Sequence, residues 1–197
     1  MELAIVKYNA GNIQSVLYAL ERIGIMGRVT DDVNEIQSAD KVIFPGVGEA
    51  SSAMSYLKER KLDEVIKNLK QPVLGICLGM QLLCTSSEEN NTNCLDIVPI
   101  RVKRFSDDIS ELKIPQIGWN NIYDLRSSLF RDVKNDSYIY NVHSYYAEDS
   151  IYTLAKCKYG LEYAAAIGNK NFYGVQFHTE KSSEVGEQIL KNFLEKI

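Results

Sequence analysis

The first half of the chain alternates short apolar runs with segments in which apolar residues recur at helical spacing. Short apolar runs bounded by turn residues are typical of buried parallel strands. They occupy residues 3–6, 41–44 and 73–76, and residues 27–30 show a weaker strand pattern. Helical spacing appears at residues 13–23, 51–57 and 62–69, and in the residues that follow Cys77. Strands that alternate with helices in this way predict a parallel sheet with helices on both faces.

Strand-like patterns dominate the second half of the chain. Residues 86–93 are polar and are expected to form an exposed loop. Short segments bounded by turn residues predict strands at residues 100–105, 137–142, 152–158, 161–167 and 172–177. Ser182 and Ser183 are expected to cap a final helix. The expected fold class is three-layer α/β, with a mostly parallel central sheet, helices on both faces and an antiparallel layer that extends or flanks the sheet.

Composition narrows the functional classes. The chain has 197 residues, of which 45% are hydrophobic and 24% charged, as expected for a single domain spanning residues 1–197. The net charge of −4 gives no reason to expect nucleic acid or an anionic membrane as a partner. No apolar run reaches the length of a membrane span, and the four cysteines show no metal or disulfide spacing. We therefore expect a cytoplasmic protein without a metal or cofactor.

The segment 75–83 carries the most specific chemical signal. It reads Gly-Ile-Cys-Leu-Gly-Met-Gln-Leu-Leu and joins a predicted strand to a predicted helix. Gly-x-Cys-x-Gly at such a junction is the thiol form of the strand–nucleophile–helix turn. The glycines allow a tight backbone that presents Cys77 at a helix start, where unpaired N–H groups favour a thiolate. The alternative is a buried structural cysteine beside a tight turn.

A thiol nucleophile requires a base, and the base requires an orienting group. The chain has only two histidines, His143 and His178. Glu180 follows His178 by two residues, and in an extended segment their side chains point to the same side. Taken alone, His178 is better explained as a surface histidine. Beside the Cys77 motif, it becomes the candidate base and Glu180 its orienting carboxylate.

An acyl-transfer nucleophile also requires hydrogen-bond donors for the oxyanion. The backbone N–H of Leu78, directly after the nucleophile, is one candidate. The Pro-Gly-Val-Gly turn at residues 45–48 ends a predicted strand, and its glycines free the backbone to present the N–H of Val47 or Gly48. On its own, this turn is equally typical of an ordinary strand end.

Together, the motifs at residues 45–48, 75–81 and 177–180 resemble those of the class I, triad-type glutamine amidotransferases. Further stretches resemble the glutaminase subunits of imidazole glycerol phosphate synthase, at residues 8–16, 118–120, 142–146 and 180–182. The sequence departs from the family's usual pattern at several points. A glycine is usual at or near Asn9, and the loop before Ile97 lacks the glycine-rich form often seen there. An acidic residue, a histidine and a proline are usual where this chain has Lys7, Gln116 and Thr179.

The resemblance implies that glutamine is hydrolysed to glutamate and ammonia through a thioester on Cys77, with His178 as the base and Glu180 fixing its tautomer. It also implies that four residues bind the amino-acid end of glutamine: Gly48, Gln81, Ser144 and Tyr145. The implied partner is a (β/α)8-barrel cyclase subunit. In a heterodimer, this subunit uses the ammonia to make imidazole glycerol phosphate and AICAR in histidine biosynthesis.

Three alternative functions fit part of the same pattern. One is a sister glutaminase subunit that supplies ammonia to a synthetase forming amidino groups on surface sugars. Another is a stand-alone cysteine hydrolase, which Gln81 and the 45–48 turn disfavour. The third is a non-catalytic assembly subunit, which the intact set of thiol, imidazole and carboxylate disfavours.

Several residues outside these motifs have simple structural explanations. Cys84 is expected in the core, two helical turns after the nucleophile. The pair Glu88 and Glu89 is expected to be solvated. His143 is equally compatible with a wall of the substrate site, a relay from the partner, or a structural histidine. Trp119 fits either the core or an interface anchor.

Overall fold

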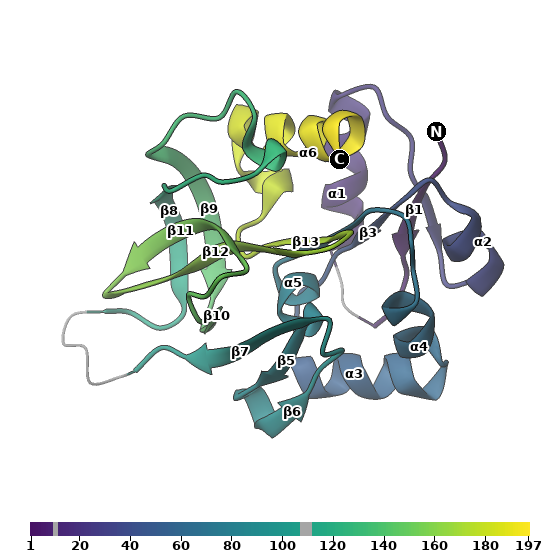
Figure 1. Ribbon diagram of the computed structural model, residues 1–197, viewed down its shortest axis with the longest axis horizontal. Coiled ribbons are helices and arrows are strands. Elements are labelled where there is room, and N and C mark those ends of the chain that lie inside the picture. The colour runs from purple at the N-terminus through teal and green to yellow at the C-terminus, as the bar shows by residue number, and fades with distance from the viewer. Residues whose placement is uncertain (10–11, 107–111) are drawn as a thin grey trace.

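The computed structural model describes residues 1–9, 12–106 and 112–197. In this part of the chain, eleven strands form one mixed sheet in the order β2-β1-β3-β4-β13-β12-β10-β7-β5-β6, with β11 paired to β12. Strands β8 and β9 form a separate two-stranded sheet beside it (Figure 1). The predicted α/β class, with a parallel sheet extended and flanked by antiparallel strands, is confirmed. Residues 10 and 11, within the 8–16 stretch named above, lie outside the described residues.

The parallel part of the sheet consists of short strands, which are largely apolar and buried except for the edge strand β2. Its members are β2 (Arg28–Thr30), β1 (Leu3–Val6), β3 (Lys41–Phe44), β4 (Val73–Ile76) and β13 (Phe172–Val175). Strands β1, β3 and β4 have the predicted bounds, because runs of four apolar residues between polar or turn residues leave little freedom in their placement. Strand β13 comes from the end of the chain and pairs with β4, so two distant segments end at the same edge.

Mainly antiparallel strands continue the sheet beyond β13, although β5 pairs with β7 in parallel. They are β12 (Leu161–Asn169), β11 (Thr153–Tyr159), β10 (Tyr145–Ala147), β7 (Val98–Arg104), β5 (Cys84–Ser87) and β6 (Thr92–Asn93). The exposed loop expected at residues 86–93 is wrong, since β5, a 3-10 turn at Glu89–Asn91 and β6 occupy it. Ser87 and Thr92 are buried there, and their hydroxyls bond to the backbone of Glu89, which compensates for the loss of water.

Helices cover both faces of the sheet (Figure 1). On one face lie α1 (Ile13–Arg22) and α6 (Ser183–Lys196), and on the other lie α2 (Val33–Ser38), α3 (Ala50–Glu59), α4 (Leu62–Lys67) and α5 (Leu78–Leu83). The sequence pattern missed α2 because one buried residue, Ile36, is too little to establish a period. No helix among the described residues is long and apolar enough to cross a membrane.

The two-stranded sheet pairs β8 (Gln116–Ile122) with β9 (Ser137–His143). Strand β8 was not predicted, because only one of its faces is buried and that face includes polar residues. The expected serine cap on α6 is also wrong. The Ser182 hydroxyl donates to the His178 carbonyl at 2.6 Å and accepts the Tyr140 N–H at 3.0 Å. It therefore ties β9 to the turn that carries His178.

Candidate active site

Cys77 occupies a strained turn between β4 and α5. Its backbone has φ 54° and ψ −110°, a conformation that residues with a side chain rarely adopt. A Cβ atom at Gly75 would lie 2.8 Å from the backbone of Gly79, and one at Gly79 would collide with the carbonyl oxygen of Phe44. Both glycines of the motif are therefore required by the close approach of β3, β4 and α5.

The side chains of Cys77, His178 and Glu180 meet in a buried cluster. His178 and Cys77 line the same pocket, and Nδ1 of His178 lies 2.7 Å from Oε1 of Glu180. Burial by itself lowers the pKa of His178, but its interactions with Cys77 and Glu180 outweigh burial and raise the pKa to about 10. The cluster therefore favours an imidazolium beside the sulfur.

The sequence pattern predicted that His178 and Glu180 lie in one extended segment. This prediction is wrong, although the two side chains do meet. His178 has an extended backbone, but Glu180 lies within a 3-10 turn, Thr179–Lys181. Thr179, at the position where a proline is usual in the family, is buried in this turn. The turn brings the carboxylate within 2.7 Å of the imidazole Nδ1, so the predicted pair forms through a different local geometry.

A pocket of about 270 Å³ opens in front of the sulfur. Eight of the nine predicted site residues line it: Val47, Gly48, Cys77, Leu78, Gln81, Ser144, Tyr145 and His178. The ninth, Glu180, is bonded to His178 and is not among the pocket residues. The tertiary structure thus brings together segments from distant regions of the sequence.

Glu89 also lines the pocket, and the sequence analysis missed it. Its Oε2 accepts the backbone N–H of Ala50 at 2.7 Å, and burial raises the pKa of its carboxyl group against the opposing effect of that bond. The expectation of a solvated pair is therefore wrong for Glu89, whereas Glu88 is exposed. Nothing in the local sequence distinguishes the two residues, because the inward position of Glu89 depends on the 3-10 turn at Glu89–Asn91 and its contact with the distant Ala50.

The predicted oxyanion donors lie side by side at the pocket. The N–H of Leu78 donates to the carbonyl oxygen of Gly46 at 3.2 Å. Val47 is half-buried and Gly48 has φ 111°, which favours glycine there. The Leu78 donor is therefore occupied by a protein carbonyl in this conformation.

A buried hydrogen-bond network surrounds the pocket. The Gln81 Nε2 atom donates to the carbonyl oxygen of Tyr145 at 3.1 Å and to Oε1 of Gln176 at 3.0 Å. His143 lies with Nδ1 2.8 Å from the same Tyr145 oxygen and Nε2 3.3 Å from the Tyr163 hydroxyl. Burial lowers the pKa of His143 to about 4, against the raising effect of the Tyr145 bond. His143 is therefore a neutral part of the pocket wall.

The remaining sequence predictions fall in different places. Cys84 is buried in the core, as expected. Trp119 is 54% exposed and so is not a core residue. Gln116 is buried and accepts a hydrogen bond from the Tyr163 hydroxyl at 3.1 Å, whereas Lys7 is exposed at the end of β1.

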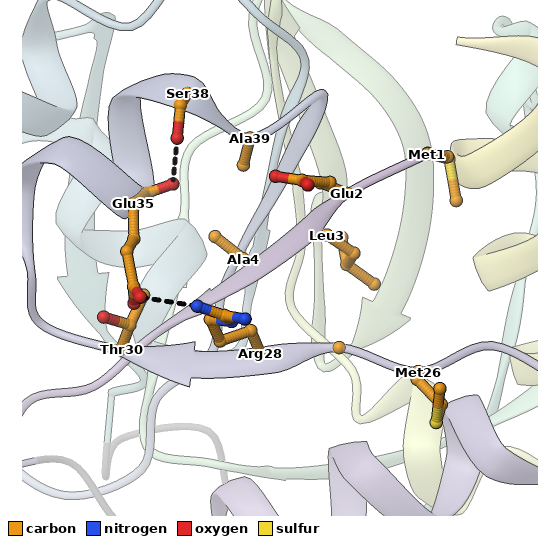
Figure 2. Close-up of a pocket in the computed structure, with 11 residues that line it drawn as sticks. Met1, Glu2, Leu3, Ala4, Met26, Arg28, Thr30, Glu35, Ser38 and Ala39 are labelled. Atoms are coloured by element: carbon orange, nitrogen blue, oxygen red, sulfur yellow. Dashed lines mark hydrogen bonds and ion pairs between the residues drawn. The ribbon is translucent and has the colours of Figure 1, made fainter.

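A larger cavity, of about 560 Å³, lies at the opposite edge of the parallel sheet, between β1, β2 and α2. Figure 2 shows its residues, among them Arg28, which reaches across to Glu35 at 2.6 Å. Met26 at its rim is 94% exposed. The cavity contains none of the predicted site residues, and the arrangement of its side chains suggests no reaction.

Comparison with known proteins agrees with this geometry. The family model described as "Glutamine amidotransferase class-I" matches residues 5–197. The chain is 54% identical to the imidazole glycerol phosphate synthase subunit HisH of Bacteroides fragilis, over 99% of this chain and all of that protein. It is 44% identical to the HisH subunit of Haemophilus influenzae, over all of this chain and 98% of that protein.

Solved structures with little sequence similarity share the fold. PurLQS from Thermotoga maritima has a TM-score of 0.70 at 16% identity, covering 99% of this chain and 98% of that one. A glutamine amidotransferase from Thermotoga maritima has a TM-score of 0.68 at 16% identity, covering 100% and 97%. With the family model and full-length relatives in agreement, the chain belongs to the class-I glutamine amidotransferases and, among them, to the HisH subunits of imidazole glycerol phosphate synthase.

Proposed function

We propose that this chain is the glutaminase subunit of an imidazole glycerol phosphate synthase, hydrolysing glutamine at Cys77 and passing ammonia to a (β/α)8-barrel cyclase. The observation that carries the proposal is that buried Cys77 and His178 line one pocket, with Glu180 bonded to the imidazole from behind. The family model covers residues 5–197, which supports one amidotransferase domain. A catalytic thiol must remain reduced, in agreement with the expected cytoplasmic location.

In the proposed reaction, His178 takes the thiol proton, and the sulfur of Cys77 attacks the side-chain amide carbon of glutamine. The imidazolium then gives its proton to the leaving nitrogen, so ammonia departs and a glutamyl thioester remains. His178 next takes a proton from water, whose oxygen attacks the thioester. Glutamate is released and the thiol is restored, with Glu180 holding the imidazole throughout.

The pocket offers acceptors for the α-ammonium group of glutamine. Both N–H groups of Gln81 are used by Tyr145 and Gln176, so its free capacity is the oxygen, an acceptor. Among the described residues that line the pocket, Glu89 is the only carboxylate. We therefore assign the ammonium group to Gln81 and Glu89. The substrate carboxylate then faces Gly48 and the Ser144–Tyr145 backbone.

The oxyanion requires a local rearrangement. Because the Leu78 N–H is bonded to the Gly46 carbonyl, the developing oxyanion must displace that carbonyl before it can accept the bond. Rotation of the Gly46–Val47 peptide would remove the carbonyl and present the Val47 N–H at the same time. Each donor gained in this way is worth about 3 kcal/mol of the barrier.

The partner is expected at the outer face of the β8–β9 sheet. Ile117, Trp119 and Tyr138 are 63%, 54% and 61% exposed there, and Tyr140 packs edge-on against Trp119. Exposed large apolar side chains gathered on one face are typical of protein interfaces. Val142, on the same face by register, has its carbonyl oxygen 3.9 Å from Cys77 Sγ, so ammonia is released close to this surface.

Reconstitution with candidate synthase subunits tests the proposal. The chain is mixed with the cyclase subunit or the sugar-modifying synthetase of its source cell, and glutamate release and product formation are followed. Glutamine-dependent imidazole glycerol phosphate formation with the cyclase is expected, and it should vanish in Cys77→Ala. Activity only with the sugar synthetase, or full glutaminase activity without either partner, would overturn the proposed pathway or the partner dependence.

A further inference from the structure

We propose that Gln176 is a positioning residue for the nucleophile, whose side-chain amide donates a hydrogen bond to the Cys77 sulfur and favours its thiolate form. This inference rests on the proposed function, because it concerns the same sulfur. Gln176 Nε2 lies 3.8 Å from Cys77 Sγ, and Gln176 is 0% exposed, so water does not compete for the contact.

The pairing of β13 with β4 places Gln176 beside the sulfur. In this parallel pair Val175 lies opposite Ile76, and the Cys77 N–H donates to the Val175 carbonyl at 2.8 Å. Gln176 and Cys77 are thus the next residues of two adjacent strands at the same edge. The contact depends on the register between segments about one hundred residues apart (176 − 77 = 99), not on a local motif.

The orientation of the Gln176 amide follows from the network that holds it. A glutamine side chain has one donor end and one acceptor end. The backbone oxygen of Tyr145 only accepts, so Gln81 turns its NH₂ group toward it. The second N–H of that group reaches Gln176 and must meet its oxygen. The NH₂ group of Gln176 is then the end that faces the sulfur.

A donor at this position acts on the charge of the sulfur. A thiolate accepts hydrogen bonds strongly and a thiol weakly, so the contact lowers the free energy of the charged form. The titratable groups around the sulfur are His178, the buried Tyr8, and His143 and Glu89 across the pocket. Gln176 has no ionisable group. Its hydrogen bond is therefore expected to shift the pH midpoint of Cys77 ionisation without adding a second titration step.

The test is the pH dependence of Cys77 alkylation by iodoacetamide in the intact chain, without glutamine or partner. In Gln176→Met the midpoint is expected to rise by about one pH unit, the loss of one hydrogen bond to a charged group. Gln176→Glu, which replaces the donor with an acceptor, is expected to raise it further. Gln116→Met is the matched control, because it removes a buried glutamine that bonds to Tyr163 instead of the sulfur. Equal midpoints in the wild type and a folded Gln176→Met would overturn the inference.

Two further measurements keep the outcome clear. If the Gln176 variants do not fold, the wild type is titrated with pH and followed by NMR. The chemical shift of one glutamine side-chain amide is expected to change with the same pH midpoint as Cys77 alkylation. The absence of any such amide contradicts the inference. Glutamate release by the wild type with its partner is measured separately. If the wild type turns over glutamine but the Gln176 variants keep the wild-type alkylation midpoint, only the inference about Gln176 is wrong. If the variants shift the midpoint but the wild type does not turn over glutamine, the inference is supported and the proposed function is wrong.

Discussion

The Nδ1 atom of His178 lies 2.7 Å from Oε1 of Glu180, with only 4% and 2% of the two side chains exposed. Among the described residues, the second Glu180 oxygen, Oε2, has no hydrogen-bond partner. The buried carboxylate therefore depends on the imidazole for its stabilisation, and the imidazole depends on the carboxylate for its tautomer and charge.

Replacing Glu180 with glutamine should reduce kcat for glutamine hydrolysis by about 10²–10⁴-fold, because a neutral amide neither fixes the tautomer nor stabilises the imidazolium. The substitution preserves shape, so the thermal midpoint should change little compared with kcat. Steady-state glutamate release by the complex with the synthase measures the effect. Glu187→Gln, which removes an exposed carboxylate paired with Arg22, is the control and should retain activity.

The backbone strain at Cys77 predicts that two inactive variants differ in stability. Both Cys77→Ala and Cys77→Gly should lose glutaminase activity. Glycine tolerates φ 54° and alanine does not, so Cys77→Gly should be more stable than Cys77→Ala by about 1 kcal/mol. Urea unfolding of the two variants provides the comparison. A more stable alanine variant would mean that the turn relaxes when the sulfur is removed.

Burial of neutral His143 predicts a loss of stability in acid. Its pKa is lowered from 6.5 to about 4, so below pH 6.5 the unfolded chain binds more protons than the folded one. The contribution to stability is complete above pH 6.5 and is lost as the pH falls to about 4. The total loss should not exceed about 3 kcal/mol.

Urea midpoints measured between pH 7 and pH 4 test this effect. His143→Asn keeps a donor for the Tyr145 carbonyl but has no group that titrates in this range. Its midpoint should therefore fall less steeply with acid than that of the wild type. Parallel slopes would show that other groups, such as buried carboxylates, account for the acid sensitivity.

Removing the charge of Glu89 should weaken substrate binding more than the chemical step. In Glu89→Gln, KM for glutamine should rise about 10- to 100-fold, since a hydrogen bond to a charged group is lost. The value of kcat should change little, because the ammonium group lies away from the reacting carbon. Glu88→Gln, at the exposed neighbouring position, should leave KM unchanged. An equal loss in both variants would place the ammonium group elsewhere.

Trp119 should contribute strongly to association with the synthase. Truncation of a central interface tryptophan often costs about 2 kcal/mol or more, so Trp119→Ala should raise Kd at least about tenfold. Tyr18→Ala on α1 is matched in exposure, 55% against 54%, and should leave Kd unchanged. Titration calorimetry with the partner measures both values. Unaltered binding by Trp119→Ala would move the interface away from β8 and β9.

Local sequence determined the parts of the molecule that depend on neighbouring residues. The four-residue apolar strands and the turn at Cys77 follow from patterns within a few positions, because strand burial and glycine conformation are local requirements. The pairing of His178 with Glu180 was also within reach, although a 3-10 turn and not an extended strand produces it. The reason for the contact was therefore wrong even though the residues were right.

Only the tertiary structure decided which polar residues outside the recognised motifs lie at the active-site pocket. Gln176 enters the site through the pairing of β13 with β4, and Glu89 through a 3-10 turn whose carboxylate reaches Ala50, and no local pattern marks either residue. The exposed position of Trp119 likewise depends on which face of β8 packs against the core. Register and strand order are set by the burial of the whole core, so these positions become defined only when the chain has folded around it.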